Sequence, residues 1–152
     1  MNDSLLLAYA RVGFAGKSPW APGTCGSLVA IVLAPFIFMP LPFFGRVLLL
    51  LLVLVTGTIA SGRAESLLGK KDPSEVVIDE VLGQWLTCLP FVTLGFWEYA
   101  AAFALFRLFD ITKPWPVRRL ERIGGGLGIM IDDAAAGLYA MLCLALVRML
   151  AG

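Results

Sequence analysis

Long apolar stretches separated by short polar stretches dominate this sequence. We expect five apolar segments, at residues 27–44, 47–60, 81–97, 99–109 and 129–151. Only the last reaches the about 20 residues that a helix needs to cross a bilayer comfortably. Pro35, Pro40 and Pro42 interrupt the first segment, so we expect it to be kinked, broken or partly re-entrant. The pattern predicts an all-α integral membrane bundle with four or five spanning segments, some of them short or broken.

The composition agrees with a membrane protein. Hydrophobic residues make up 59% of the chain and charged residues 15%, whereas about 25% of residues are charged in a typical soluble domain. A chain of 152 residues has the length of one domain, which we place at residues 1–152, and it is too short to bury this much apolar sequence in a soluble core. The net charge of +1 gives no reason to expect nucleic-acid binding.

The charged residues are divided unevenly between the two ends of the expected segments. With five crossings, ten of the twelve Lys and Arg residues fall on one face, and only Arg46 and Arg148 fall on the other. Of the eleven acidic residues, only Glu98 joins them. An excess of basic residues marks the cytoplasmic side of a membrane protein. We therefore expect a multi-pass protein of the cytoplasmic membrane, with its functional residues facing the cytoplasm.

Five carboxylates stand at the ends of apolar segments. Asp79 and Glu80 begin one apolar helix, Asp132 and Asp133 begin another, and Asp110 ends a third. Carboxylates at membrane depth are costly unless they are paired, and an all-oxygen set without His or Cys suits Mg²⁺. Helix capping is the alternative, and it explains one acid of each doublet but not Asp110 at the unfavourable end of a helix. We predict that all five are catalytic residues and magnesium ligands.

Cations and hydroxyl groups accompany these acids. Arg107 and Lys113 each lie about one helical turn from Asp110, and we predict that they bind a phosphate group. The stretch 22–27 offers Thr24, Ser27 and backbone N–H groups to an anion, although a simple turn explains it equally well. For three further basic residues we favour a role at the membrane interface; they are Arg118, Arg119 and Arg122.

Several catalytic mechanisms are excluded by the residues that are missing. The chain has no His, so it has no histidine nucleophile and no Ser-His-Asp triad. Its three Cys residues lack the spacing of a disulfide framework or a zinc site. Metal-assisted attack on phosphorus remains, either with a carboxylate as the general base or through a covalent intermediate at Asp110.

Glycine and tryptophan residues suggest structural roles. We expect Gly83 and Gly137 to let helices approach closely, and we expect the tryptophans to anchor the chain at the membrane interfaces. The stretch 124–128 is either a flexible lid or a turn. The sequence 78–83 is similar to 131–137, which either reflects a duplication or two helices that solve the same problem.

Four ordered motifs carry a resemblance to a known family. They lie at residues 22–28, 72–83, 106–116 and 125–137. In them the chain resembles bacterial phosphatidylglycerophosphatase A along essentially its whole length. The resemblance implies an Mg²⁺-dependent inner-membrane enzyme that removes the terminal phosphate of phosphatidylglycerophosphate and gives phosphatidylglycerol. It carries functional roles onto the acids and cations above, and it adds Asp72 as a supporting acid. Glu121 stands where family members carry other polar residues.

Other functional classes stay open at this point. A small transporter would also place carboxylates in a membrane, but here they lie at helix ends on one side rather than along a path. A structural subunit would not need acid doublets. An enzyme for another lipid monophosphate would fit as well, because acyl chains need only apolar grooves. The sequence does not decide the oligomeric state or the number of metal ions.

Overall fold

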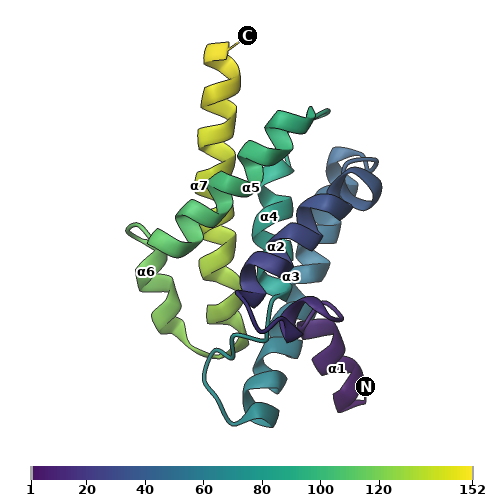
Figure 1. Ribbon diagram of the computed structural model, residues 1–152, viewed down its shortest axis with the longest axis vertical. Coiled ribbons are helices and arrows are strands. Elements are labelled where there is room, and N and C mark those ends of the chain that lie inside the picture. The colour runs from purple at the N-terminus through teal and green to yellow at the C-terminus, as the bar shows by residue number, and fades with distance from the viewer. Residues whose placement is uncertain (1, 152) are drawn as a thin grey trace.

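The computed structural model describes residues 2–151, with the side chains of Glu121 and Ala151 left aside, so the prediction for Glu121 lies outside the described part. This part of the chain is all-helical, as predicted (Figure 1). The α-helices are α1 (Asp3–Ala10), α2 (Pro22–Leu33), α3 (Phe43–Leu68), α4 (Ile78–Cys88), α5 (Phe96–Thr112), α6 (Val117–Leu120) and α7 (Gly125–Ala151). Short 3₁₀-helices lie at Ala15–Lys17 and Glu121–Ile123.

Two of these helices are long and apolar enough to cross a membrane, by length and composition. They are Phe43–Leu68 and Gly125–Leu150, each of 26 residues. In the most apolar 18-residue stretch of each helix, only 28% and 44% is buried, whereas the core helix of a soluble protein is mostly buried. Leu48, Leu52 and Ile59 of α3 are exposed, as are Leu142 and Leu146 of α7. Such a continuous apolar surface is typical of contact with lipid.

The prediction for the second segment was wrong in length. We expected residues 47–60, but α3 continues through Arg63 and Glu65 and ends before Gly69, which has a φ of 62°. One face of the helix is buried along its whole length, and its last turns use the small residues Gly57, Ala60 and Ala64 there. Because these turns contain polar residues, the hydrophobic pattern did not predict them as part of the helix.

The first and third segments are interrupted. After α2 the chain forms a π-helix at Ala34–Phe38, which contains Pro35, and then turns into α3. The predicted interruption of the first segment is therefore confirmed. Pro35 cannot donate the backbone hydrogen bond of a regular α-helix, and the helix is irregular at this residue. The third segment, expected at 81–97, is not one helix: α4 ends at Cys88, and α5 begins at Phe96. The described residues establish two possible spans, and four or five spans stays a prediction.

Helix α4 occupies the middle of the bundle. It packs against α2, α3, α5 and α7, and nearly all of its residues are buried. Trp85 is among them: its indole N–H donates to the carbonyl oxygen of Ala30 at 2.9 Å. The predicted interfacial anchoring is therefore wrong for Trp85, whereas Trp20, Trp97 and Trp115 are exposed. Because α4 is central, the acids in its first turn are carried into the interior.

Arg46 connects two turns at the end of the bundle that holds the start of α3. Its guanidinium donates to carbonyl oxygens of Met39 at 2.6 Å, Leu41 at 2.9 Å, Phe91 at 2.5 Å and Leu89 at 3.3 Å. These acceptors satisfy a buried charge without a carboxylate. The irregular stretch between α4 and α5 is thereby fixed to the turn that precedes α3.

Candidate active site

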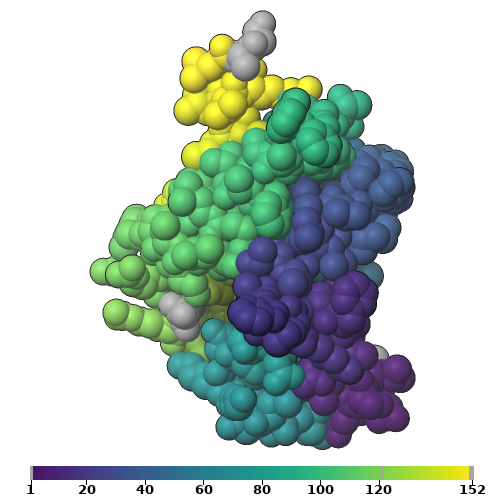
Figure 2. All heavy atoms as spheres, viewed as in Figure 1, coloured from purple at the N-terminus to yellow at the C-terminus, as the bar shows by residue number. Residues whose placement is uncertain are grey.

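A polar cavity of about 290 Å³ lies where α2, α4, α5 and α7 meet the segment at 69–77. We call it the acid pocket. It is lined by Pro22, Gly23, Asp72, Pro73, Ser74, Val76, Asp79, Glu80, Asp110, Lys113, Asp132 and Asp133. All five predicted carboxylates are therefore in its wall, together with Lys113 and Asp72. In Figure 2 the surface is hollowed on this side, between the green α5–α6 segment and the teal segment that precedes α4.

The two acid doublets reach the pocket from different positions in their helices. Asp79 and Glu80 occupy the first turn of α4, as predicted. Asp132 and Asp133 do not begin a helix: α7 begins at Gly125, so this doublet lies two turns further along. The glycine stretch, expected to be a lid or a turn, forms the first turn of α7 from Gly125 onward. Helix capping therefore cannot explain Asp132 and Asp133.

Arg107 holds two of the acids together. Its Nη1 donates to the two carboxylate oxygens of Glu80 at 2.7 and 2.8 Å, and to Asp110 Oδ2 at 2.5 Å. The hydroxyl of Ser27 also donates to Glu80. Arg107 itself is absent from the residues that line the pocket. The contact with Asp110 follows the predicted spacing of one turn, but in this structure Arg107 positions carboxylates, and its role toward phosphate stays a prediction.

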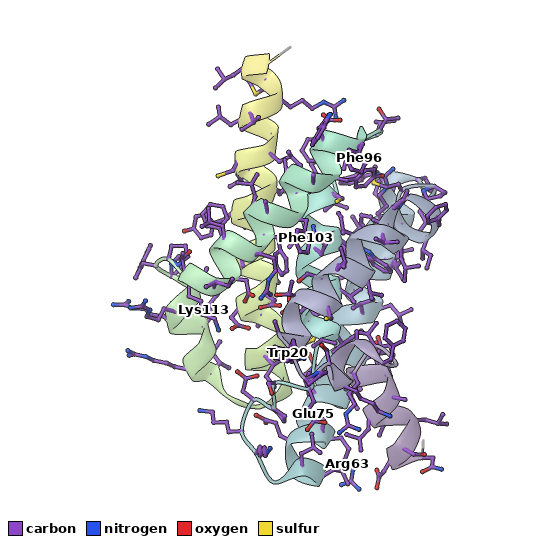
Figure 3. The ribbon with its side chains drawn as sticks, in the orientation of Figure 1. Trp20, Arg63, Glu75, Phe96, Phe103 and Lys113 are labelled. Carbon is purple, nitrogen blue, oxygen red and sulfur yellow. The ribbon has the colours of Figure 1, made fainter. Side chains whose placement is uncertain are left out.

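Lys113 has a different partner from the one that the spacing suggests. It ends α5 with a φ of 42°, and its Nζ donates to Asp132 Oδ2 of α7 at 2.8 Å. Figure 3 shows Lys113 at the α6 end of helix α5. Because its side chain lines the pocket, Lys113 is placed to contact an anion inside it. Its predicted role in phosphate binding is compatible with this position.

Asp79 and Asp133 are the carboxylates whose surroundings most favour a bound cation. Asp79 Oδ1 and Asp133 Oδ2 are buried and have no hydrogen-bond partner in the described structure. A buried acceptor without a partner costs about 1–3 kcal/mol, and more when it is charged. Burial, with Glu80 next in importance, raises the pKa of Asp79 well above its usual range. A cation beside these oxygens would offset both costs.

The five carboxylates do not form a ready-made metal site. Among the described residues, no three acidic side chains are arranged closely enough to hold a metal ion. Arg107 is paired with Glu80 and Asp110, and Lys113 is paired with Asp132. Magnesium binding by all five acids stays a prediction, and the two oxygens without partners are the observation that fits it.

The predicted hydroxyl groups do not line the pocket. Thr24 and Ser27 belong to the first turns of α2, and neither side chain lines the pocket. The buried Ser27 hydroxyl contacts Glu80 and the carbonyl oxygen of Gly23. Their roles in phosphate binding stay predictions, and the contacts of Ser27 indicate support of Glu80.

Gly23 and Ser74 are among the pocket residues that the sequence reasoning missed. A Cβ at Gly23 would lie 2.3 Å from Glu80 Oε1, so Gly23 leaves room for that carboxylate. The Pro-Gly-Thr motif was the available signal, but we read it as a source of backbone N–H groups. Ser74 also lines the pocket.

Comparison with known proteins decides the family. The family model described as Phosphatidylglycerophosphatase A matches residues 8–148. The chain belongs to the phosphatidylglycerophosphatase A family. A phosphatidylglycerophosphatase A of Escherichia coli (strain K12) is 40% identical over 133 residues, which cover 85% of this chain and 76% of that protein. One from Haemophilus influenzae is 35% identical over 144 residues, which cover 93% and 86%.

A third relative carries a different name. A protein of Bacteroides thetaiotaomicron named "Putative phosphatidylinositol-3-phosphatase" is 40% identical over 158 residues, which cover 99% of both chains. No solved structure matches significantly. The resemblance is thus confirmed, and every carboxylate of the acid pocket lies within the matched residues.

Proposed function

We propose that this protein is a phosphatase that hydrolyses the terminal phosphate monoester of phosphatidylglycerophosphate, giving phosphatidylglycerol and inorganic phosphate. Family membership supports the reaction. The main structural support for the site comes from two buried carboxylates, Asp79 and Asp133. They line one cavity with Lys113, and each has one oxygen without a hydrogen-bond partner in the described structure.

In this proposal the residues of the acid pocket have different roles in the reaction. Lys113 binds the terminal phosphate, because its ammonium group is in the wall of the pocket. Water attacks phosphorus while a pocket carboxylate accepts its proton, the bond from phosphorus to the glycerol oxygen breaks, and that oxygen takes up the proton to give the hydroxyl group of phosphatidylglycerol. Attack by Asp110, followed by hydrolysis of the aspartyl phosphate, is the alternative. Arg107 fixes Glu80 and Asp110 in either case.

We also propose that the acid pocket binds Mg²⁺. Asp79 and Asp133 would hold the ion through their partnerless oxygens, with Glu80, Asp110 and Asp132 as the further predicted ligands. When bound, Mg²⁺ supplies polarisation of the phosphoryl group and neutralises its charge. Hard oxygen donors are the ligands that this ion prefers.

The position of the pocket also supports a membrane orientation. Arg63 and Glu75 lie at one end of the molecule, and Phe96 lies at the other (Figure 3). The acid pocket opens between the segment at 69–77 and the end of α5, which is on the charged side. By the positive-inside rule this end faces the cytoplasm. We therefore place the enzyme in the inner membrane as a multi-pass protein with a cytoplasmic site.

Phosphate release by the purified protein in detergent tests the reaction. The substrates are phosphatidylglycerophosphate, phosphatidic acid and, because of the name of the Bacteroides relative, phosphatidylinositol 3-phosphate, each with Mg²⁺ or with a chelator. We expect Mg²⁺-dependent release that is fastest from phosphatidylglycerophosphate. Faster release from either other lipid would contradict the substrate assignment, and no release by folded protein would contradict the enzyme.

A further inference from the structure

A second cavity, of about 390 Å³, adjoins the acid pocket. Its wall comes from the end of α3, the segment at 69–77, α6 and the start of α7, and it includes Lys71, Arg118 and Arg122. We call it the basic pocket. Asp72 and Asp132 line both cavities, so the two cavities share part of their wall.

Three cations and three acids line the basic pocket, and the acids are Glu65, Asp72 and Asp132. The carboxylate of Glu65 accepts from the backbone N–H of Asp72 at 2.8 Å, and Asp132 is paired with Lys113. By contrast, Arg118 and Arg122 form no ion pair with any side chain that the structure describes, although both line the cavity. Exposed guanidinium groups in a concave wall are well suited to bind a phosphate group, which accepts two parallel hydrogen bonds from one of them.

The proposed substrate carries two phosphate groups, and the acid pocket is built for one. Among the described residues, its lining contains one cation, Lys113, and Arg107 is paired with Glu80 and Asp110. The phosphodiester that links the head group to the lipid is also negative and needs a counter-charge near the site. After hydrolysis, the released phosphate needs a route out between the same walls.

We propose that Arg118 and Arg122, with Lys71 across the cavity, form a second phosphate subsite that binds a phosphate group not undergoing hydrolysis. The group is either the phosphodiester of the lipid substrate or the released inorganic phosphate. The assignment rests on the proposed function. It replaces the interfacial role that the sequence suggested for Arg118 and Arg122.

Arg119 provides a matched control. It is exposed, it lies on the same short helix as Arg118, and it carries the same charge. Its guanidinium lies 5.9 Å from the centre of the Trp115 ring, and it lines neither the acid pocket nor the basic pocket, only a separate cavity that Arg118 and Arg122 also line. If these arginines only attracted anionic lipid to the surface, loss of Arg119 would matter as much as loss of Arg118 or Arg122.

The experiment compares wild type, the double variant Arg118→Gln/Arg122→Gln and the single variant Arg119→Gln in detergent micelles. Melting temperatures establish that all three are folded. For each protein, kcat and KM are measured with phosphatidylglycerophosphate, together with the inhibition constant of inorganic phosphate. Phosphatidic acid, which has one phosphate group, gives a KM if it is hydrolysed and an inhibition constant if it only competes.

Loss of two charge-assisted contacts should weaken binding by about tenfold or more in the double variant only. A rise in KM for phosphatidylglycerophosphate, with phosphatidic acid unaffected, assigns the subsite to the phosphodiester. A rise in the inhibition constant of inorganic phosphate assigns it to the product. An equal effect of Arg119→Gln, or no effect of the double variant, overturns the proposal. Wild-type protein that releases no phosphate would instead overturn the proposed function.

Discussion

Gly137 of α7 lies directly against the backbone of Gly83 of α4. A Cβ on Gly137 would be 2.3 Å from the carbonyl oxygen of Gly83, and a Cβ on Gly83 would be 2.6 Å from the carbonyl oxygen of Asp133. The predicted close approach of the two helices is confirmed. This contact sets the separation of α4 and α7, and it therefore also sets the separation of the acid doublets that they carry.

Gly137→Ala should destabilise the protein, because the added methyl group forces the two helices apart. Overpacking of this kind costs about 1–3 kcal/mol. The measurement is thermal unfolding in detergent. Gly95→Ala is the control, since a Cβ at Gly95 meets only Glu98 Oε2, at 3.6 Å. Equal melting temperatures for the two variants would contradict the tight packing described here.

Asp79→Asn and Asp133→Asn should each reduce kcat by about 100-fold or more, the size of effect that loss of a positioned catalytic group produces. The shapes of the side chains are retained, so folding should be preserved. Phosphate release from phosphatidylglycerophosphate measures the effect, with Glu98→Gln as a control at the other end of the bundle. Full activity of both Asp variants would show that the partnerless oxygens have no catalytic role.

Magnesium should stabilise the folded protein independently of turnover. A ligand at 100 times its dissociation constant adds about 2.7 kcal/mol to the free energy of unfolding. We expect Mg²⁺ to raise the melting temperature of wild type, and we expect chelator to reverse the rise. The double variant Asp79→Asn/Asp133→Asn should show no such rise. If it responds as wild type does, the ion binds elsewhere.

The stability of metal-free protein should depend on the titration of Glu80. Burial, followed by the nearby charge of Asp110, raises the pKa of Glu80 from 4.5 to about 7, although Arg107 acts in the opposite direction. Between these two pH values the folded state retains a proton that the unfolded chain has lost. The contribution of Glu80 to stability is thus present below pH 4.5 and is lost as the pH rises through about 7.

Glu80→Gln removes this titration. In the presence of chelator, the melting temperature of the variant should fall less steeply over this pH range than that of wild type. Glu65→Gln serves as the comparison, because Glu65 lies outside the acid pocket. If the melting temperature of Glu80→Gln depends on pH as steeply as that of wild type does, then Glu80 of wild type is already ionised at low pH.

Local patterns in the sequence were sufficient for much of the site. The doublet at Asp79 and Glu80, the turn from Arg107 to Asp110 and the small residues at Gly83 and Gly137 were all recognised from short-range spacing. The pairing of Lys113 was not, because its partner Asp132 is 19 positions away and belongs to another helix. Only the packing of α5 against α7 brings these two residues together.

Helix lengths were harder to predict for a related reason. The last turns of α3 contain Arg63 and Glu65, which a search for apolar residues treats as a boundary. In the fold, Arg63 donates to Asp3 of α1 at 3.0 Å, so polar contacts continue the helix beyond its apolar part. Trp85 was misjudged because its burial depends on a carbonyl oxygen from α2, which no local pattern reveals.

The contacts of Arg46 have a consequence for the way in which this sequence can vary. All four hydrogen-bond acceptors around its guanidinium are backbone carbonyl oxygens, from residues 39, 41, 89 and 91. Every amino acid supplies that oxygen, so the two turns can exchange side chains over evolutionary time without losing the link. Lysine has a single donor nitrogen and cannot reach the same four acceptors. Among homologues, position 46 should therefore stay arginine while the residues that surround it diverge.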